Sequence, residues 1–199
     1  MAKGKPYRLG CVILASGLGK RFGGNKLLAS FRGRPMISHA LTATEGLFEK
    51  RVVVTRREDV AQLCRAQGAE TVVHSLPYRS DTVRLGMEAL GDLDGVLFCP
   101  GDQPLLRRET VAALVHAFWE EPGCIWRPAY EGRPGAPVLF PGWTFPELLS
   151  LPEGQGGGYV ARKYPERVRL MPIDSEKELW DVDTPEDLAQ LEESISSLA

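Results

Sequence analysis

Short apolar segments recur along the first hundred residues, at positions 9–15, 51–55, 71–74 and 95–99. Each has the length of a strand and few polar side chains, as buried strands of a parallel sheet do. Between them, apolar residues repeat at helical spacing in segments 35–47, 58–67, 82–90 and 108–121. This alternation predicts a three-layer α/β/α fold with a mostly parallel, Rossmann-like sheet.

The second half of the chain has a different pattern. Seven prolines between residues 120 and 152 break any long helix there: Pro122, Pro128, Pro134, Pro137, Pro141, Pro146 and Pro152. Irregular strands and loops are therefore expected, with a mobile loop at the glycine-rich stretch 154–158. A further strand is predicted at 168–173, and a last helix is predicted to begin at 184–187, where threonine can cap and proline fits the first turn.

Length and composition are those of an ordinary soluble protein. The 199 residues, 43% hydrophobic and 25% charged, predict one domain spanning 1–199. A net charge of -2 gives no overall attraction to nucleic acid or to a membrane surface. No apolar run approaches the roughly 20 residues of a membrane span or forms a signal peptide, so a cytoplasmic location is expected.

The cysteines indicate buried thiols and no metal centre. They are widely spaced, without a C-x-x-C pair or a histidine at ligand spacing: Cys11, Cys64, Cys99 and Cys124. Three histidines (His39, His74 and His116) have no catalytic partner visible in the sequence and are expected to be core or surface residues. The four tryptophans receive no functional role.

The densest chemical signal is the stretch LASGLGKRFGGNK, residues 14–26. A glycine-rich turn after a first strand lets backbone N–H groups approach phosphate oxygens closely. The stretch lacks the lysine and hydroxyl positions of a Walker A loop. Its glycines read G-x-G-x-x-x-G, one residue longer than the dinucleotide fingerprint.

A dinucleotide site remains one alternative. Arg56 and Arg57 follow the second predicted strand, where an NADP-dependent reductase could hold a 2′-phosphate. A dinucleotide site does not explain Arg21 and Lys26. Two cations at the far end of the loop suit a triphosphate whose charge must be neutralised as pyrophosphate leaves.

Residues 14–23 (L-A-S-G-L-G-K-R-F-G), with Lys26, resemble the L-A-A-G-x-[SG]-x-R-[MF]-G-x-x-K signature of the MobA-like nucleotidyltransferases. Ser16 replaces the second alanine. Three further motifs follow in the family's order: G-D-Q-P at 101–104, G-R-P-G-A-P-V-L-F at 132–140 and D-V-D-T-P-E-D-L at 181–188. Together they resemble the molybdenum cofactor cytidylyltransferase branch, which implies a fold of the nucleotide-diphospho-sugar transferase type.

The resemblance implies transfer of CMP from CTP to the phosphate of molybdopterin, with release of pyrophosphate. It implies a nucleotide site formed by Leu14, Ala15, Ser16, Gly17, Leu18, Gly19, Lys26, Thr82 and Arg84. It also implies that Asp102 and Asp183 hold Mg²⁺, whose hard-oxygen preference fits two carboxylates at one rim of the sheet. Arg21, Lys26 and Asp102 are then the catalytic residues, and no general base is needed because a phosphomonoester is already largely dianionic.

Two departures from the family pattern leave the acceptor open. Ala136 stands where the family commonly has histidine, and stretch 153–158 lacks the usual acid and arginine. A different phosphorylated acceptor is therefore an alternative. Use of GTP in place of CTP and a non-catalytic nucleotide-binding cofactor chaperone are further alternatives to CTP-dependent transfer. The resemblance also implies that the protein has a molybdoenzyme apo-protein as a partner.

Overall fold

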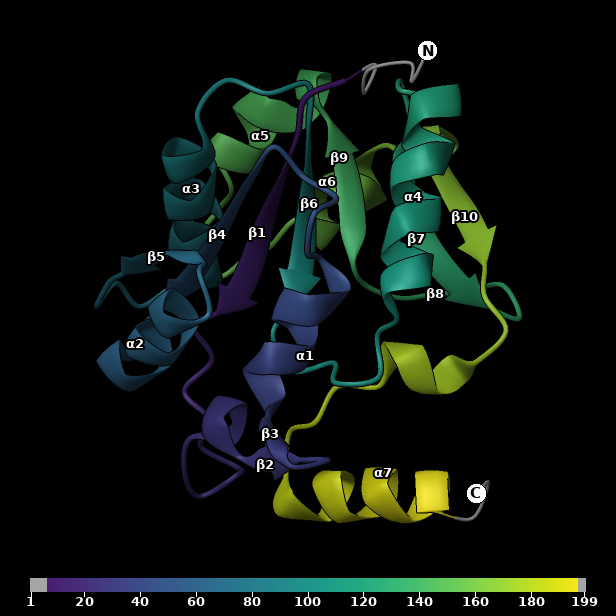
Figure 1. Cartoon of the computed structure of the whole chain (residues 1–199). Coiled ribbons are helices and arrows are strands. Elements are labelled where there is room, and N and C mark those ends of the chain that lie inside the picture. The colour runs from purple at the N-terminus through teal and green to yellow at the C-terminus, as the bar shows by residue number, and fades with distance from the viewer. Residues whose placement is uncertain (1–6, 197–199) are drawn as a thin grey trace.

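A computed structural model describes residues 7–196. Its main element is an eight-stranded sheet with the order β10-β7-β9-β6-β1-β4-β5, in which β8 pairs with β7 (Figure 1). A separate small hairpin joins β2 and β3. The strands are β1 (Leu9–Ala15), β2 (Ser30–Phe31), β3 (Arg34–Pro35), β4 (Lys50–Thr55), β5 (Glu70–Val73), β6 (Gly95–Pro100), β7 (Ile125–Tyr130), β8 (Arg133–Pro134), β9 (Val138–Pro141) and β10 (Val168–Pro172).

The sheet is mostly parallel, as predicted. Strand β1 pairs in parallel with both β4 and β6, and β5 continues beyond β4. Strand β9 runs antiparallel to both of its neighbours, β6 and β7. All five strands predicted from the sequence are present, with ends within one residue of the prediction.

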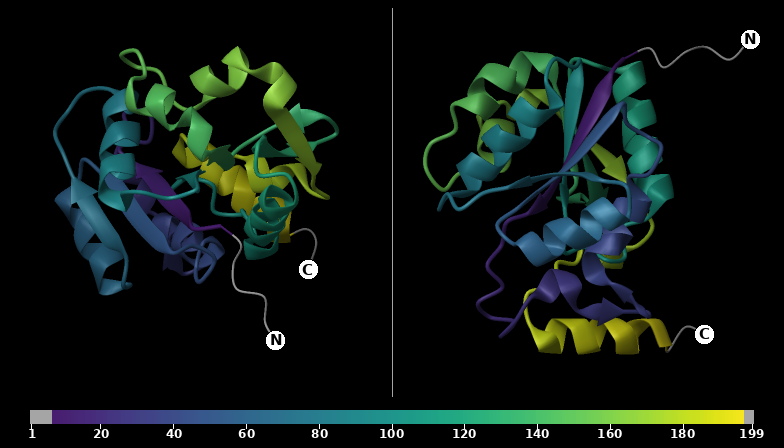
Figure 2. Two further views of the ribbon diagram at one scale, coloured as in Figure 1. Left: turned by 90° about the horizontal axis from the view of Figure 1, so that it is seen from above. Right: turned by 60° about the vertical axis from the view of Figure 1, so that its left-hand side comes forward.

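Helices cover both faces of the sheet. One face carries α1 (Met36–Ala43), α2 (Glu58–Ala66) and α4 (Arg108–Glu120), and the other carries α3 (Arg79–Leu90), α5 (Phe145–Leu149) and α6 (Gly158–Lys163). Figure 2 shows the sheet between these two layers. Strand β1 serves both cores, since Cys11 and Ile13 face one and Val12 faces the other. Burial on both faces explains its unbroken apolar sequence.

The proline-rich half is more regular than the sequence suggested. Strand β7 contains Pro128, and Pro146 lies in the first turn of α5, where proline fits. Gly158 begins α6, so the glycine-rich stretch leads directly into a helix. Helix α3 starts three residues before the predicted position, because Asp81 accepts a hydrogen bond from the Tyr78 N–H at 3.0 Å and fixes the first turn.

The last helix, α7 (Pro185–Ser196), lies beside the β2-β3 hairpin at the end of the molecule toward which β1 and β6 point (Figure 1). A small core of Phe31, Met36, Val182 and Leu191 joins them. Short 3-10 turns connect other elements: η1 (Lys26–Leu28), η2 (Gly142–Thr144), η3 (Pro165–Arg167) and η4 (Glu176–Leu179). Among the described residues, no helix combines the length and the apolar character that crossing a membrane requires. The four cysteines are free and buried, as predicted.

Glu178 fixes the segment that precedes α7. Its side chain is 3% exposed and accepts hydrogen bonds from the Thr110 hydroxyl at 2.5 Å and the Arg107 Nε at 2.7 Å. The Arg107 backbone N–H also donates to it, at 3.1 Å. A buried carboxylate is stable only with such partners, so Glu178 ties η4 to the start of α4.

Replacing Glu178 by alanine should lower the free energy of unfolding by about 2–4 kcal/mol, because Thr110 loses its acceptor and the segment loses its anchor. Urea denaturation measures the change. Glu176→Ala is the matched control on the same turn, since its pair with Arg133 is exposed and worth less than about 1 kcal/mol. Equal losses in the two variants would contradict this role of Glu178.

Candidate active site

The candidate site lies where the strand order reverses. From β1 the chain moves to β4 and β5 on one side, and then returns to β6 on the other side. The loops after β1 and β6 therefore diverge at the carboxyl end of the sheet, the usual position of ligand sites in such folds. A cavity of about 760 Å³ opens there. This volume suits a ligand of nucleotide size.

The glycine loop forms one wall of the cavity. Gly19 has a φ of +59°, and a Cβ there would lie 2.8 Å from the Gly24 carbonyl oxygen, so the turn requires glycine. The Phe22 N–H closes this turn on the Gly19 carbonyl at 2.9 Å. At Gly17 a Cβ would meet no atom within 4 Å, because that backbone borders open space. The loop therefore presents bare backbone to the cavity, as a phosphate-binding turn does.

Lys26 joins the two predicted acidic residues. Its ammonium group donates to Asp102 Oδ2 at 2.6 Å and to Asp183 Oδ1 at 2.9 Å. It also donates to the Val182 carbonyl oxygen at 2.9 Å, and its side chain is only 9% exposed. Three segments far apart in the sequence thus meet at one buried cation.

The electrostatics of this cluster favour the charged forms. Burial alone lowers the pKa of Lys26, but the charges and hydrogen bonds of Asp102 and Asp183 outweigh it and raise the pKa above the ordinary value. The hydrogen bond from Lys26 lowers the pKa of Asp183, and Arg21 adds to this effect. Arg21 contacts Asp183 Oδ2 at 2.7 Å.

Backbone contacts position Asp102. The Gly101 N–H donates to the Leu14 carbonyl at 3.0 Å, and the Val182 N–H donates to the Asp102 carbonyl at 3.0 Å. A Cβ on Gly101 would lie 2.7 Å from Ile37 Cδ1, so only glycine lets the chain turn this close to β1 and α1. These bonds hold Asp102 between the glycine loop and the last segment.

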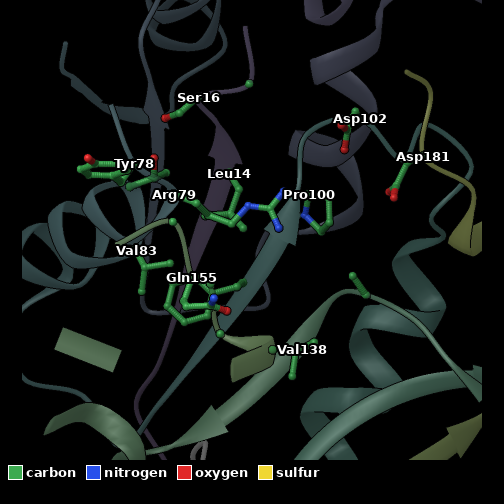
Figure 3. Close-up of a pocket in the computed structure, with 18 of the residues that line it drawn as sticks. Leu14, Ser16, Tyr78, Arg79, Val83, Pro100, Asp102, Val138, Gln155 and Asp181 are labelled. Atoms are coloured by element: carbon green, nitrogen blue, oxygen red, sulfur yellow. The ribbon is translucent and has the colours of Figure 1, made fainter. Parts of the chain in front are cut away.

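Asp181 is a third acid of the cavity wall, which the sequence analysis did not single out. Figure 3 shows it beside Asp102, across the cavity from Tyr78 and Arg79. Burial raises its pKa, with a further contribution from the Asp102 charge, while the Gln103 side-chain amide donates to Oδ1 at 2.9 Å. Its place in the D-x-D motif, two residues before Asp183, was the available signal. Among the described residues, no group of three or more His, Cys, Asp or Glu side chains has the arrangement of a metal site.

His74 is the second residue that the sequence analysis missed. Its Nε2 lies 2.9 Å from the Ser16 hydroxyl, which donates to the Val54 carbonyl at 3.1 Å. Since that hydroxyl has one proton, His74 Nε2 must donate to it. Burial, with the nearby charge of Arg56, lowers the pKa of His74 and keeps the ring neutral. His74 therefore fixes the first residue of the glycine loop.

Some of the predicted nucleotide-binding residues line the cavity and others do not. Leu14, Ser16, Gly17, Leu18, Gly19 and Thr82 line the cavity. Ala15 is buried beneath the cavity. Lys26 is also buried, and it contacts Asp102 and Asp183, which line the cavity. Arg84 is not among the lining residues, because its guanidinium pairs with Glu88 at 3.0 Å and with Asp81 at 3.6 Å. Arg79, at the start of the same helix, lines the cavity instead.

The family model of the MobA-like NTP transferase domain matches residues 11–168. The chain belongs to this family. The match runs from β1 into β10 and includes the glycine loop and Asp102. The sequence-based assignment is thereby confirmed, and the family is one of nucleotidyltransferases.

The relatives of this MobA-like chain are named for enzymes with different substrates. A probable molybdenum cofactor guanylyltransferase of Thermococcus gammatolerans is 28% identical over 188 residues, which cover 90% of this chain and 96% of the relative. The bifunctional enzyme IspD/IspF of Rhodospirillum rubrum is 30% identical over 128 residues. That match spans 59% of this chain and only about a third (33%) of the longer relative.

Solved structures confirm the fold of the MobA-like chain. Rv0371c of Mycobacterium tuberculosis, in complex with manganese, superposes with a TM-score of 0.75 at 23% identity and covers 94% of this chain and 99% of its own. A CMP:2-keto-3-deoxy-manno-octonic acid synthetase structure complexed with CTP gives 0.78 at 16% identity, covering 96% and 100%. The expected fold, of the nucleotide-diphospho-sugar transferase type, is therefore correct.

Replacing Lys26 by methionine should destabilise the protein by about 2 kcal/mol at pH 7, because two facing carboxylates lose their shared cation. The lowered pKa of Asp183 gives stability above its unfolded value of about 4, and this stability is lost as the pH falls through the folded value. The raised pKa of Lys26 gives stability below about 10.5, which is lost in alkali. The difference from wild type should therefore be widest between about pH 5 and pH 9.

Urea denaturation of both proteins at pH 7 and near pH 3.5 measures this dependence. Lys20→Met is the matched control, since Lys20 is an exposed cation of the same loop. A stability difference that stays constant into acid would contradict the role assigned to the Lys26 cluster.

Proposed function

We propose that this protein transfers a nucleoside monophosphate from a nucleoside triphosphate to the phosphate of a molybdopterin-type acceptor and releases pyrophosphate. CTP is the favoured donor. The observation that carries the proposal is the meeting of Lys26, Asp102 and Asp183 at the rim of a cavity walled by the glycine loop. A fixed cation, paired carboxylates and bare backbone N–H groups are what phosphoryl chemistry requires.

Each segment of the cluster has a distinct task in this mechanism. The backbone between Gly17 and Gly19 binds phosphate oxygens, as the open space beside Gly17 allows. Arg21, 72% exposed and paired with Asp183, lies at the far end of the loop and neutralises the leaving pyrophosphate. Lys26 holds both carboxylates in place while the acceptor phosphate attacks the α-phosphate in line.

Asp102 and Asp183 fit the Mg²⁺ that such chemistry uses. The shared contact with the Lys26 ammonium group brings the two carboxylates close together, and both line the cavity. Two carboxylates completed by waters and substrate phosphates are a common magnesium donor set. The ion would neutralise charge on the phosphates. The manganese-bound structural neighbour supports a divalent cation in this fold.

The identity of the base is the finer part of the proposal. Ser16, Tyr78 and Thr82 line the part of the cavity next to the glycine loop and α3, and offer the polar groups that a base needs. The CTP-bound structural neighbour supports cytosine, and the guanylyltransferase name of the Thermococcus relative supports GTP as the alternative. The resemblance to the cytidylyltransferase branch favours CTP.

The acceptor half of the cavity also departs from the family pattern in space. Ala136 lines the cavity and offers no imidazole, so another group must orient the acceptor. A molybdoenzyme apo-protein, as receiver of the product, belongs to the same proposal. The proposal also includes a single domain over residues 1–199 and a cytoplasmic location.

The two alternative functions have weaker support. A reductase would use Arg56 and Arg57, but Arg57 pairs with Asp59 at 2.9 Å, and only Arg56 lines the cavity. A non-catalytic cofactor chaperone would need the loop but not two acids arranged around Lys26. Family membership favours the transferase over both.

Replacing Asp102 by asparagine should lower transfer on the order of 10²–10³-fold while the fold persists, since a carboxylate that would hold the charge-neutralising Mg²⁺ is lost. Pyrophosphate release with CTP, Mg²⁺ and molybdopterin measures the loss. Asp92→Asn is the matched control, because Asp92 is 98% exposed at a remote turn. Wild-type activity in Asp102→Asn would overturn the assignment.

Thermal shifts with CTP, GTP, ATP, UTP and NADPH, each with and without Mg²⁺, test the donor without any acceptor. A ligand at 100 times its dissociation constant stabilises by about 2.7 kcal/mol, which is several degrees for a domain of this size. CTP with Mg²⁺ should give the largest shift. A shift with NADPH alone would support the reductase instead.

A further inference from the structure

Three arginines line the cavity away from Lys26: Arg79 from α3, Arg127 from β7 and Arg162 from α6. No carboxylate pairs with any of them among the described residues. Of the other fourteen described arginines, eight contact an acid: Arg8, Arg21, Arg57, Arg65, Arg84, Arg107, Arg133 and Arg169. Among the described residues, Arg56 also lines the cavity without a carboxylate partner. The three cations therefore face the cavity without neutralisation from the described part of the chain.

Arg127 and Arg162 repel one another. Arg127 is half-buried, and its Nε donates to the Gly135 carbonyl oxygen at 3.0 Å, which fixes the guanidinium in the wall. Burial lowers its pKa, and the charge of Arg162 lowers it further. Arg127 is half-buried and Arg162 is exposed, so an anion bound between them would offset the repulsion of the two like charges.

The glycine-rich stretch makes room for this cluster. A Cβ on Gly156 would lie 2.8 Å from Arg79 Cδ, and one on Gly158 would lie 3.4 Å from Arg162 Nη1. Arg162 Nη2 also approaches Gln155 Oε1 at 3.4 Å. Figure 3 shows Arg79 and Gln155 near one another in the cavity. The stretch expected to be a mobile loop is thus packed under two arginine side chains.

Arg127 and Asp181, both of which line the cavity, have different charged neighbours. The charges that shift the pKa of Asp181 are those of Asp102, Asp183 and Lys26, whereas the charge acting on Arg127 is that of Arg162. The cavity wall therefore includes acids that contact Lys26 and, from other elements, guanidinium groups without a carboxylate partner among the described residues. A ligand that reaches both parts of the wall needs anionic groups at two places.

We propose that Arg79, Arg127 and Arg162 bind a second anionic group of the acceptor, which is then an organic phosphate with at least one further negative group. The inference rests on the proposed transferase function, since it assigns these arginines to the acceptor. Guanidinium forks bind phosphate, carboxylate and similar oxyanions through paired, charge-assisted hydrogen bonds. They supply the positive charge that stretch 153–158 lacks.

The first arm of the test needs no acceptor. Inorganic phosphate is titrated into wild type, Arg127→Met, Arg127→Lys and Arg162→Met, and the midpoint of thermal unfolding is followed. The phosphate-dependent shift should fall by at least half in both methionine variants and persist in Arg127→Lys. Arg65→Met, which removes a paired arginine of α2, should keep the full shift. Arg162 is exposed, so its variant gives the answer even where Arg127→Met fails to fold.

The second arm measures transfer from CTP to molybdopterin. Arg162→Met should raise the KM for molybdopterin roughly tenfold or more, as loss of a charge-assisted contact does, with the KM for CTP unchanged. An undiminished phosphate shift in both methionine variants, or equal increases in both KM values, would overturn the proposal. If wild type transfers nothing to molybdopterin, the proposed function fails while the phosphate titration still decides the anion site.

Discussion

The contact of the Lys26 ammonium group with Asp102 and Asp183 is the interaction on which the rest of the site depends. Lysine is rarely buried unless it is paired, and here it is 7% exposed as a residue. The two carboxylates keep it charged, and it keeps them close together. Because the three residues come from the loop after β1, the turn after β6 and the segment before α7, this one contact closes the site from three directions.

The surrounding structure supplies the positions that this contact needs. The reversal of strand order between β1 and β6 opens the cavity, and Gly101 lets the chain turn tightly beside β1. Glu178 ties the preceding segment to α4, while the core of Phe31, Met36, Val182 and Leu191 holds the following one. Each of these supports is a buried side chain or a feature of the backbone. Rigid parts of the fold therefore hold the charged side chains of the site in place.

Local pattern made the first half of the fold predictable. Runs such as 9–15 are buried on both faces and therefore apolar throughout, which leaves a clear signal in the sequence. The order of motifs likewise pointed to the glycine loop, Asp102 and Asp183, which the structure brings together at Lys26. The glycine loop and Asp102 directly follow the ends of β1 and β6, whereas Asp183 immediately precedes α7. Strand β9 pairs with β6 and strand β7 pairs with β10, so segments far apart in the sequence fix these strands, and no local periodicity indicates them.

Side-chain direction was the part that sequence could not supply. Arg79 and Arg84 lie on one helix, yet Arg79 lines the cavity and Arg84 pairs with Glu88 on the surface. His74 became relevant only when the end of β5 met Ser16 across the sheet. Arg127 and Arg162 lie in segments without a motif, and only the packing of β7, α6 and the glycine-rich stretch brings them to the cavity wall.

The most direct measurement follows the α-phosphate. Wild-type protein is incubated with Mg²⁺, molybdopterin and CTP or GTP labelled at the α-phosphate, and the products are separated. Label should move into the acceptor, with one pyrophosphate released for each transfer. Label that stays in the triphosphate, or that appears as free nucleoside monophosphate, would contradict it.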